Sequence, residues 1–144
     1  MFIGEYEHSL DTKNRLSIPR RFRDQALADG DAVAFFLTRG LDECLFIFTE
    51  AQWEKVVAGL STKPFTDSAT RRFQRLFFSN AVRAELDGQG RILIPDNLKK
   101  VGGITRNITL VGVYDRIEVW DRERWKAVKE TSGGEYESLA QQLF

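Results

Sequence analysis

The segment LDTKNRLSIP occupies residues 10–19, and the segment LDGQGRILIP occupies residues 86–95. Both keep Leu, Asp, Arg, Ile and Pro at matching places, although the residues between Asp and Arg differ. The similarity continues along the chain, where Gly40, Leu45, Ile47 and Trp53 align with Gly112, Ile117, Val119 and Trp125. Self-similarity of this extent marks a duplicated structural unit. The 144-residue chain is therefore predicted to contain two copies of one unit.

Each repeated segment is predicted to be a β-hairpin followed by a short helix. Apolar residues alternate with polar ones on either side of a tight turn, which is the period of a half-buried strand. The residue before Arg is Asn14 in the first copy and Gly90 in the second, and both residue types tolerate positive φ. Pro19 and Pro95 end the strands and favour helix starts, because proline donates no ladder hydrogen bond and has a helix-compatible φ. The expected strands are 4–10, 15–18, 81–86 and 91–94, and the expected helices are 20–27 and 96–101.

Two further strands and a capped helix complete each copy. Thr49 with Gln52 resembles a capping box, and Asp121 is placed to cap the corresponding second helix. Trp53 and Trp125 each follow a cap by four residues, where they can fold back onto the sheet. The expected strands are 33–37, 44–48, 108–113 and 116–120, and the remaining helices are 66–79 and 135–143. We therefore expect an α+β, mostly β chain with a first unit at 1–60, a connecting helix at 61–80 and a second unit at 81–144.

Composition limits the class of protein. At 42% hydrophobic residues the chain can bury a core. No secretory signal or membrane-length apolar run is present, so a soluble, cytoplasmic protein is expected. The single cysteine, Cys44, excludes a disulfide within the chain. The 21 basic and 21 acidic residues balance, which argues mildly against nucleic acid as a partner. However, residues 13–23 hold a cluster of basic residues without an acid, namely Lys13, Arg15, Arg20, Arg21 and Arg23.

The D-x-x-x-R pattern is the strongest candidate for a functional site. Asp11 with Arg15 and Asp87 with Arg91 span the two predicted turns. Such an Asp can accept backbone N–H groups of the turn and also pair with the Arg that begins the return strand. A guanidinium held in this way loses less entropy when it meets a phosphate or the O6/N7 edge of guanine. Two copies related by an approximate two-fold axis would present two such groups on one face.

Several alternatives compete with this interpretation. An exposed Asp-Arg pair can be an ordinary surface ion pair. An enzyme is disfavoured, because nothing in the sequence places His8 near Cys44, and no catalytic, metal or cofactor site is expected. A second hypothesis is a structural or protein-interaction scaffold that lacks DNA binding, and a third is an antitoxin. The scaffold hypothesis rests on aromatic residues beyond an obvious core, namely Phe35, Phe36, Phe73, Phe77 and Phe78.

The doubled L-D-x-x-x-R-[LI]-x-I-P motif resembles that of the MraZ family of bacterial transcription regulators. The resemblance covers essentially the whole chain, including RRFQRLFF between the copies. It implies two fused AbrB-like swapped-hairpin half-units forming a pseudo-two-fold barrel with peripheral helices. It also implies a homo-oligomeric ring that is cytoplasmic and nucleoid-associated. The ring is expected to bind repeated boxes in double-stranded promoter DNA and to repress the division and cell-wall gene cluster. No membrane or small-molecule partner is expected.

The resemblance also suggests which residues bind DNA. Carried over by position, the motif residues are Asp11, Arg15, Asp87 and Arg91, and Lys13 lies within the first motif. Asn14 departs from the usual Gly before the Arg. Arg20, Arg21 and Arg23 lie outside the motif and are candidates for phosphate contacts.

Overall fold

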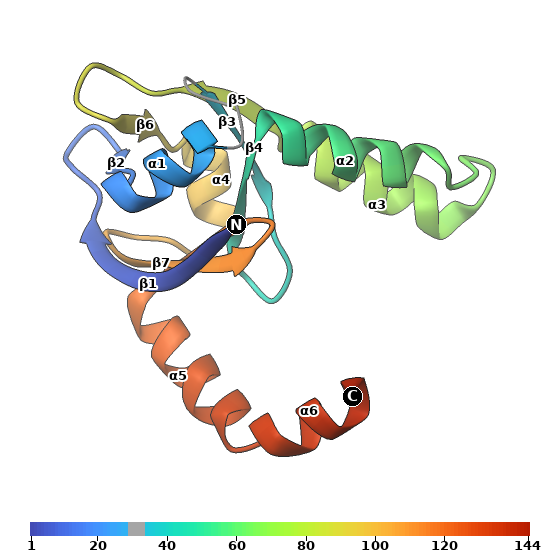
Figure 1. Ribbon diagram of the computed structural model, residues 1–144. Helices are drawn as coiled ribbons and strands as arrows, with labels where there is room; N and C mark the ends of the chain where they lie inside the picture. The colour runs from blue at the N-terminus through green and yellow to red at the C-terminus, as the bar shows by residue number, and fades with distance from the viewer. Residues whose placement is uncertain (29–33) are drawn as a thin grey trace.

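The computed structural model describes residues 1–28 and 34–144. Its elements occur in the same order twice (Figure 1). The first series is β1 (Phe2–Ser9), β2 (Arg15–Ser17), α1 (Arg20–Ala28), β3 (Ala34–Arg39), β4 (Leu45–Thr49), α2 (Glu50–Ser61) and α3 (Ser68–Ser79). The second series is β5 (Val82–Glu85), β6 (Arg91–Leu93), α4 (Asp96–Val101), β7 (Asn107–Tyr114), β8 (Ile117–Asp121), α5 (Arg122–Gly133) and α6 (Tyr136–Leu143). Position 33, the predicted start of β3, lies outside the described residues.

The strands of the two halves interleave in one antiparallel sheet. Its order is β1-β7-β8-β4-β3-β5. The edge strand β1 of the first half therefore pairs with β7 of the second, and the edge strand β5 of the second half pairs with β3 of the first. Because the duplication equates β1 with β5, β7 with β3 and β8 with β4, this order is the same from either edge. A pseudo-two-fold axis consequently passes between β4 and β8.

A two-stranded ribbon, β2 paired with β6, covers one face of the sheet. Leu16 pairs with Ile92 at its centre, and both side chains point inward. The apolar side chains in and after these strands are Leu16, Ile18, Ile92 and Ile94, none more than 2% exposed. They share one core with Leu37, Ile47, Leu110 and Val119 of the sheet. Burying each of these side chains favours folding by about 1.5–3 kcal/mol, so the ribbon is fixed firmly to the sheet.

The fold class is α+β with a predominant sheet, as predicted, whereas the pseudo-two-fold barrel that the resemblance implies is not confirmed. No ladder among the described residues joins the edge strands β1 and β5, so the six-stranded sheet is open. The physical reason is that the ribbon closes the core by side-chain packing, which removes the need for the sheet edges to meet.

Close approach of strands explains one of the repeated glycines. Gly112 of β7 pairs with Gly4 of β1. A Cβ added to Gly112 would lie 2.6 Å from the backbone nitrogen of Ile3, a distance that real Cβ atoms do not reach. Only glycine therefore allows β1 to pair closely with β7 at this point.

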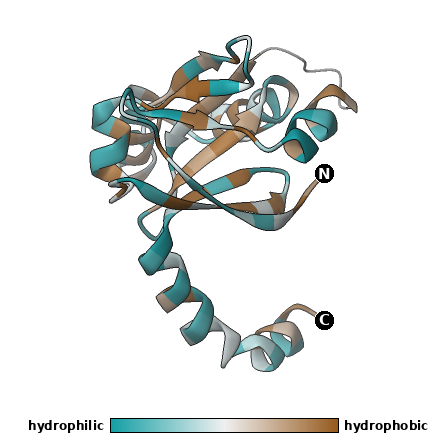
Figure 2. Cartoon of the chain, turned by 90° about the vertical axis from the view of Figure 1, so that its left-hand side faces the viewer, coloured by the Kyte–Doolittle hydropathy of each residue, from teal (hydrophilic) through white to brown (hydrophobic). Residues whose placement is uncertain are grey.

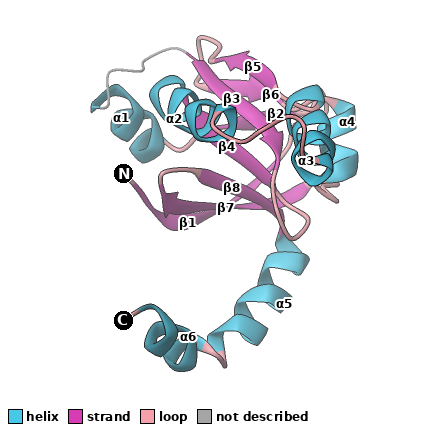
Figure 3. Cartoon of the chain, turned by 90° about the vertical axis from the view of Figure 1, so that its right-hand side faces the viewer, coloured by secondary structure: helices cyan, strands magenta, loops and turns pink. Residues whose placement is uncertain are grey.

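Two pairs of helices project from the sheet. Helices α2 and α3 form a hairpin on the right of Figure 1, whereas α5 and α6 extend below the sheet as an arm (Figures 1 and 3). The predicted caps are confirmed: Thr49 and Gln52 form a capping box at α2, and Asp121 accepts the N–H of Arg124 at α5. The predicted tryptophan contacts are also confirmed. Trp53 stacks on Phe36 of β3 at 5.0 Å between ring centroids, and Trp125 lies 5.5 Å from Trp120 of β8.

Helix α3 begins at Ser68 and ends at Ser79, inside the predicted range 66–79. Figure 2 shows hydrophobic residues mainly along the strands, whereas α5 is largely hydrophilic. Within the described residues, every helix is too short or too polar to span a lipid bilayer.

Candidate nucleic-acid interface

Asp11 organises the turn between β1 and β2. Its Oδ1 accepts the backbone N–H groups of Lys13 and Arg15, both at 2.9 Å. Its Oδ2 accepts Nε–H of Arg15 at 2.7 Å. The turn closes through the Asn14 N–H, which donates to the Asp11 carbonyl, and Asn14 adopts the positive φ that its sequence position predicted, 59°. One carboxylate thus both shapes the turn and orients the arginine.

The turn between β5 and β6 repeats this arrangement. Oδ1 of Asp87 accepts the N–H groups of Gln89 at 2.8 Å and Arg91 at 3.0 Å. Oδ2 of Asp87 accepts Nε–H of Arg91 at 2.9 Å. Gly90 has φ 74°, so it takes the place of Asn14. The contacts that the D-x-x-x-R pattern predicted are therefore formed in both copies.

The ribbon places the two motif arginines on one outer face. Arg15 pairs with Leu93, and Ser17 pairs with Arg91. Since successive residues of a strand point to opposite sides, these four residues face outward while Leu16 and Ile92 face the core. We call the outward set, Arg15, Ser17, Arg91 and Leu93, the ribbon face. Nη1 of Arg91 lies 3.7 Å from Oδ2 of Asp11, so the two hairpins also contact each other.

The ribbon face is accessible from solvent. The side chain of Arg15 is 33% exposed and that of Arg91 is 23% exposed. Leu93 is 56% exposed, which is unusual for a leucine within a strand. The turns before β2 and β6 lie together on the left of Figure 1, at the opposite end from the α2–α3 hairpin. The structure thus brings the predicted site residues Asp11, Arg15, Asp87 and Arg91 together.

The turn hydrogen bonds keep both carboxylates ionised. The backbone N–H of Arg15 is the largest cause that lowers the pKa of Asp11 from 3.8 to about 2, and the Arg15 side chain and the Lys13 N–H act in the same direction. The backbone N–H of Arg91 likewise lowers the pKa of Asp87 below its usual value. Each arginine donates its Nε–H to its aspartate. Within the described residues, the Nη groups of Arg15 make no hydrogen bond in the protein, so they can donate to a ligand.

The other basic residues predicted for this surface surround the hairpins unequally. Lys13, Arg20 and Arg21 are exposed. Arg23 is half-buried, and its Nε donates to the Ile18 carbonyl at 3.1 Å. The first half therefore supplies exposed positive charge from Lys13, Arg20 and Arg21, while Arg23 is fixed against the ribbon by its hydrogen bond.

The structure also adds residues that sequence reasoning missed. The exposed Arg106 lines a shallow 210 Å³ depression with Asp11, Asn14 and Lys99. The Lys99 ammonium donates to Oδ1 of Asn14 at 2.8 Å. Lys99 had a signal in the sequence, since it aligns with Arg23 in the duplication. Arg106 had none, because the loop that brings it to the first hairpin is set by the interleaved sheet.

Cys44 and His8, the two residues considered for chemistry, differ in burial. The side chain of Cys44 is fully buried and contacts the Leu41 carbonyl at 3.1 Å. Burial is the main cause that raises the pKa of the Cys44 thiol to about 12, so the reactive thiolate is scarce at neutral pH. Burial also lowers the pKa of His8, with a smaller effect from Arg122.

Comparison with known proteins supports the duplication. A family model described as "MraZ protein, putative antitoxin-like" matches residues 1–76 and matches again at residues 77–142. Together the two matches span nearly the whole chain. Each match contains one D-x-x-x-R hairpin, so the repeat that was recognised in the sequence is a repeat of the family domain.

Proposed function

The chain belongs to the MraZ family, and from that premise we propose that it is a sequence-specific DNA-binding transcriptional regulator. It acts as a repressor of the division and cell-wall gene cluster, in the cytoplasm at the nucleoid, by binding repeated promoter boxes. The interleaved pairing of the two halves supports an arrangement of fused AbrB-like swapped hairpins. Asp11 and Asp87 orient Arg15 and Arg91, which contact the DNA.

The observation that carries the proposal is the pair of oriented arginines on the ribbon face. The major groove of B-DNA admits a two-stranded β-ribbon, and an Arg fork matches the O6 and N7 acceptors of guanine. Both motif arginines point outward from such a ribbon, and their aspartates restrict their geometry before DNA arrives. An exposed ion pair contributes only about 0–1 kcal/mol to stability. Two copies of the same pair on an accessible face therefore favour recognition over stabilisation.

Phosphate contacts come from the neighbouring basic residues. Lys13 lies in the first turn, and Arg20 and Arg21 begin α1 beside the ribbon. Phosphate contacts set the position of a protein on the duplex, whereas base contacts supply specificity. This division of roles explains how a chain with equal numbers of basic and acidic residues binds DNA through one locally basic face.

Self-association into a ring is the second part of the proposal. The α2–α3 hairpin exposes apolar side chains at 40–73% of their area, namely Phe65, Phe73, Leu76 and Phe78. Beside it, a 360 Å³ groove is lined mainly by apolar residues, including Phe46, Phe48, Leu60 and Phe77. The arm exposes a second apolar set, namely Tyr136, Leu139, Leu143 and Phe144. Contact between two different surfaces of identical chains is heterologous and can close into a ring.

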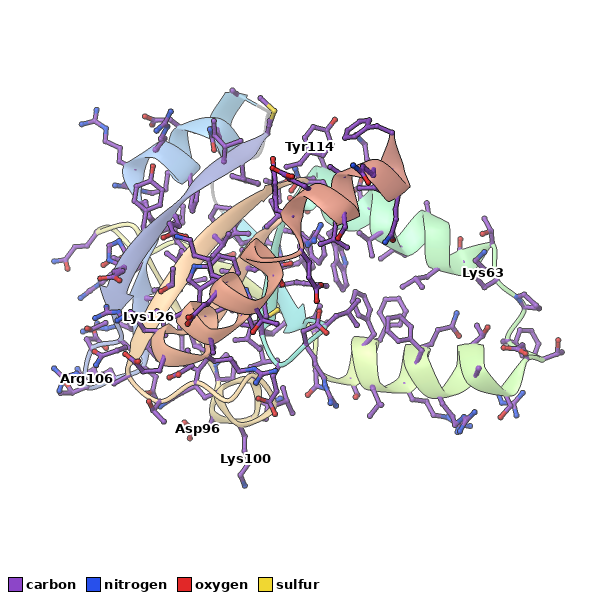
Figure 4. The ribbon with its side chains drawn as sticks, turned by 90° about the horizontal axis from the view of Figure 1, so that it is seen from below. Lys63, Asp96, Lys100, Arg106, Tyr114 and Lys126 are labelled. Atoms are coloured by element: carbon purple, nitrogen blue, oxygen red, sulfur yellow. The ribbon has the colours of Figure 1, made fainter. Side chains whose placement is uncertain are left out.

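Charge is consistent with that contact. Lys63, Arg72 and Arg75 lie on or beside the α2–α3 hairpin. Glu135 and Glu137 lie at the start of α6, beside the second apolar set, whereas α5 of the arm carries basic as well as acidic residues. Lys63 is at the tip of the α2–α3 hairpin and far from Arg106, so this hairpin and the DNA surface occupy different ends of the molecule (Figure 4). A ring would present many ribbon faces, and repeated DNA boxes would then be bound with increased effective concentration.

The decisive experiment measures binding to the DNA upstream of the protein's own gene by fluorescence anisotropy at several salt concentrations. The test variant combines Arg15→Ala with Arg91→Ala. The matched control combines Arg83→Ala with Lys100→Ala, which removes two exposed positive charges outside the ribbon face, the α2–α3 hairpin and the arm. Each bidentate arginine–guanine contact discriminates by about 1–3 kcal/mol, so the test variant is expected to lose about 30-fold or more in affinity. The control keeps wild-type affinity.

Light scattering is used to verify that both variants assemble like the wild type. If the Arg15→Ala, Arg91→Ala variant assembles normally and keeps both its affinity and its salt dependence, the DNA-binding proposal is wrong. The second candidate, a protein-interaction scaffold, would then be preferred. The observation that favours it is the exposed aromatic surface of the α2–α3 hairpin.

A further inference from the structure

Each hairpin is contacted by a cation from the opposite half of the chain. The contacted residue is the one with positive φ that immediately precedes the motif arginine, Asn14 or Gly90. Arg23 of α1, in the first half, lies against Gly90 of the second hairpin. Lys99 of α4, in the second half, binds Asn14 of the first hairpin. Arg23 and Lys99 align in the duplication, so these two contacts are related by the pseudo-two-fold axis.

The contact of Arg23 depends on the absence of a side chain at Gly90. A Cβ added there would lie 2.8 Å from Nη1 and 2.9 Å from Cζ of Arg23. The guanidinium is held in this place by its hydrogen bond from Nε to the Ile18 carbonyl. The Ile18 N–H in turn donates to the Gly90 carbonyl at 3.0 Å. Arg23 and Ile18 therefore hold Gly90 from two sides.

The contact of Lys99 uses a side chain instead. The Lys99 ammonium donates to Oδ1 of Asn14, and Nδ2 of Asn14 donates to Oδ1 of Asp96 at 3.1 Å. The Ile94 N–H donates to the Asn14 carbonyl at 2.9 Å, which mirrors the Ile18 contact. The first hairpin thus tolerates asparagine because the facing lysine and aspartate satisfy both ends of its amide.

We propose that Arg23 and Lys99 are positioning residues that fix the motif arginine of the opposite hairpin, Arg91 and Arg15 respectively. Each cation holds the positive-φ residue in the conformation that directs the next N–H toward the aspartate carboxylate. That carboxylate then orients the arginine side chain. The consequence of this positioning for DNA recognition rests on the function proposed above. The ordering of the hairpins by Arg23 and Lys99 is independent of that function, and it requires both halves of the chain.

Hydrogen exchange of the full-length protein without DNA tests the ordering. The variants are Arg23→Met and Lys99→Met, and the controls are Arg20→Met and Lys100→Met, which remove exposed charges from the same two helices. A hydrogen bond contributes about 1 kcal/mol, which corresponds to an increase of about fivefold in local exchange.

Arg23→Met is expected to accelerate exchange in residues 87–91 and to leave residues 11–15 unchanged. Lys99→Met is expected to do the reverse. The inference is overturned if exchange stays at the wild-type rate, if it rises equally in both hairpins, or if only the hairpin of the variant's own half is affected. The controls are expected to leave both hairpins unchanged.

DNA binding then distinguishes positioning from direct contact. Loss of one phosphate contact lowers the slope of log K against log salt by about 0.9. Arg23→Met is expected to keep the wild-type slope, to reduce discrimination between the upstream DNA and a scrambled duplex, and to have little further effect when combined with Arg91→Ala. A reduced slope with unchanged discrimination would instead make Arg23 a phosphate contact. If the wild type does not bind this DNA, the proposed function fails, and the exchange experiment still decides the positioning roles.

Discussion

Replacing Gly90 with asparagine is predicted to destabilise the protein, although asparagine occupies the equivalent position in the first hairpin. Gly90 has φ 74°, a region that costs most L-residues about 1–2 kcal/mol, and asparagine falls at the low end of this range. A Cβ at Gly90 would also displace the Arg23 guanidinium, 2.8 Å away. Displacement breaks the hydrogen bond to the Ile18 carbonyl, worth about 1 kcal/mol. The expected loss is therefore about 2 kcal/mol.

The substitution Arg23→Lys is predicted to rescue Gly90→Asn. The first hairpin already combines an asparagine, Asn14, with a lysine, Lys99, at a hydrogen-bonding distance of 2.8 Å. The double variant would reproduce this combination in the second hairpin. We expect it to be about 1 kcal/mol more stable than Gly90→Asn alone, although Arg23→Lys by itself loses the Ile18 hydrogen bond. Such non-additivity is the expected sign of two residues in direct contact.

Urea unfolding followed by tryptophan fluorescence measures these differences. All variants must be compared at one protein concentration, because self-association couples stability to concentration. The matched control is Gly88→Asn in the same turn, where an added Cβ would meet no atom within 4 Å, and its effect is expected to stay within about 0.5 kcal/mol. The reasoning is refuted if Gly90→Asn is as mild as Gly88→Asn, or if the double variant is no more stable than the sum of the single effects predicts.

Three other predictions follow from the described contacts. Gly112→Ala places a Cβ 2.6 Å from the Ile3 nitrogen, so the free energy of unfolding, measured with urea, is expected to fall by about 3 kcal/mol. The control Gly133→Ala, at a position with open space around it, should not lower the free energy of unfolding. Carbon-13 titration of Asp11 should show an ionised carboxylate down to about pH 2, because its folded-state pKa is lowered from 3.8 to about 2. The stability that this carboxylate contributes is present above pH 3.8 and is lost as the pH falls from 3.8 to about 2. A titration with the ordinary pKa would contradict the turn hydrogen bonds. The Cys44 thiol is fully buried and its pKa is raised to about 12, so it should resist a thiol reagent at pH 8 in the folded protein and react completely in urea. Rapid reaction of the folded protein would show that the loop before β4 opens.

Local sequence signals predicted the local structure well. The turn conformation of Asn14 and Gly90, the caps at Thr49 and Asp121, and the pairing of each motif aspartate with its arginine all depend on residues within a few positions of one another. The backbone donors and acceptors of a short turn can be satisfied in few ways, so residue type is nearly sufficient to determine such features.

Long-range arrangement could not be predicted in the same way. The duplication indicated two units, but it did not show that β1 would pair with β7 or that β3 would pair with β5. The open sheet was also missed, because the alternating pattern of a strand specifies a buried face without specifying whether a sheet or a separate ribbon covers it. The contacts of Arg23 and Lys99 with the opposite hairpins follow from this interleaving, so only the structure could reveal them.

The duplication within one chain permits a difference between hairpins that a symmetric dimer of a single unit could not have. In the first half, Lys13, Arg20 and Arg21 surround the hairpin, whereas Gln89, Asp96 and Asn97 occupy the matching positions in the second. The ribbon face differs as well, with Ser17 opposite Arg91 and Leu93 opposite Arg15. If the proposed function is correct, the two motif arginines meet DNA in unequal surroundings, since phosphate attraction is concentrated in one half. Under the proposed function, such a chain would bind DNA in a defined direction. It would therefore suit promoter boxes repeated in one orientation better than a palindrome, whose symmetry mirrors that of a symmetric protein dimer.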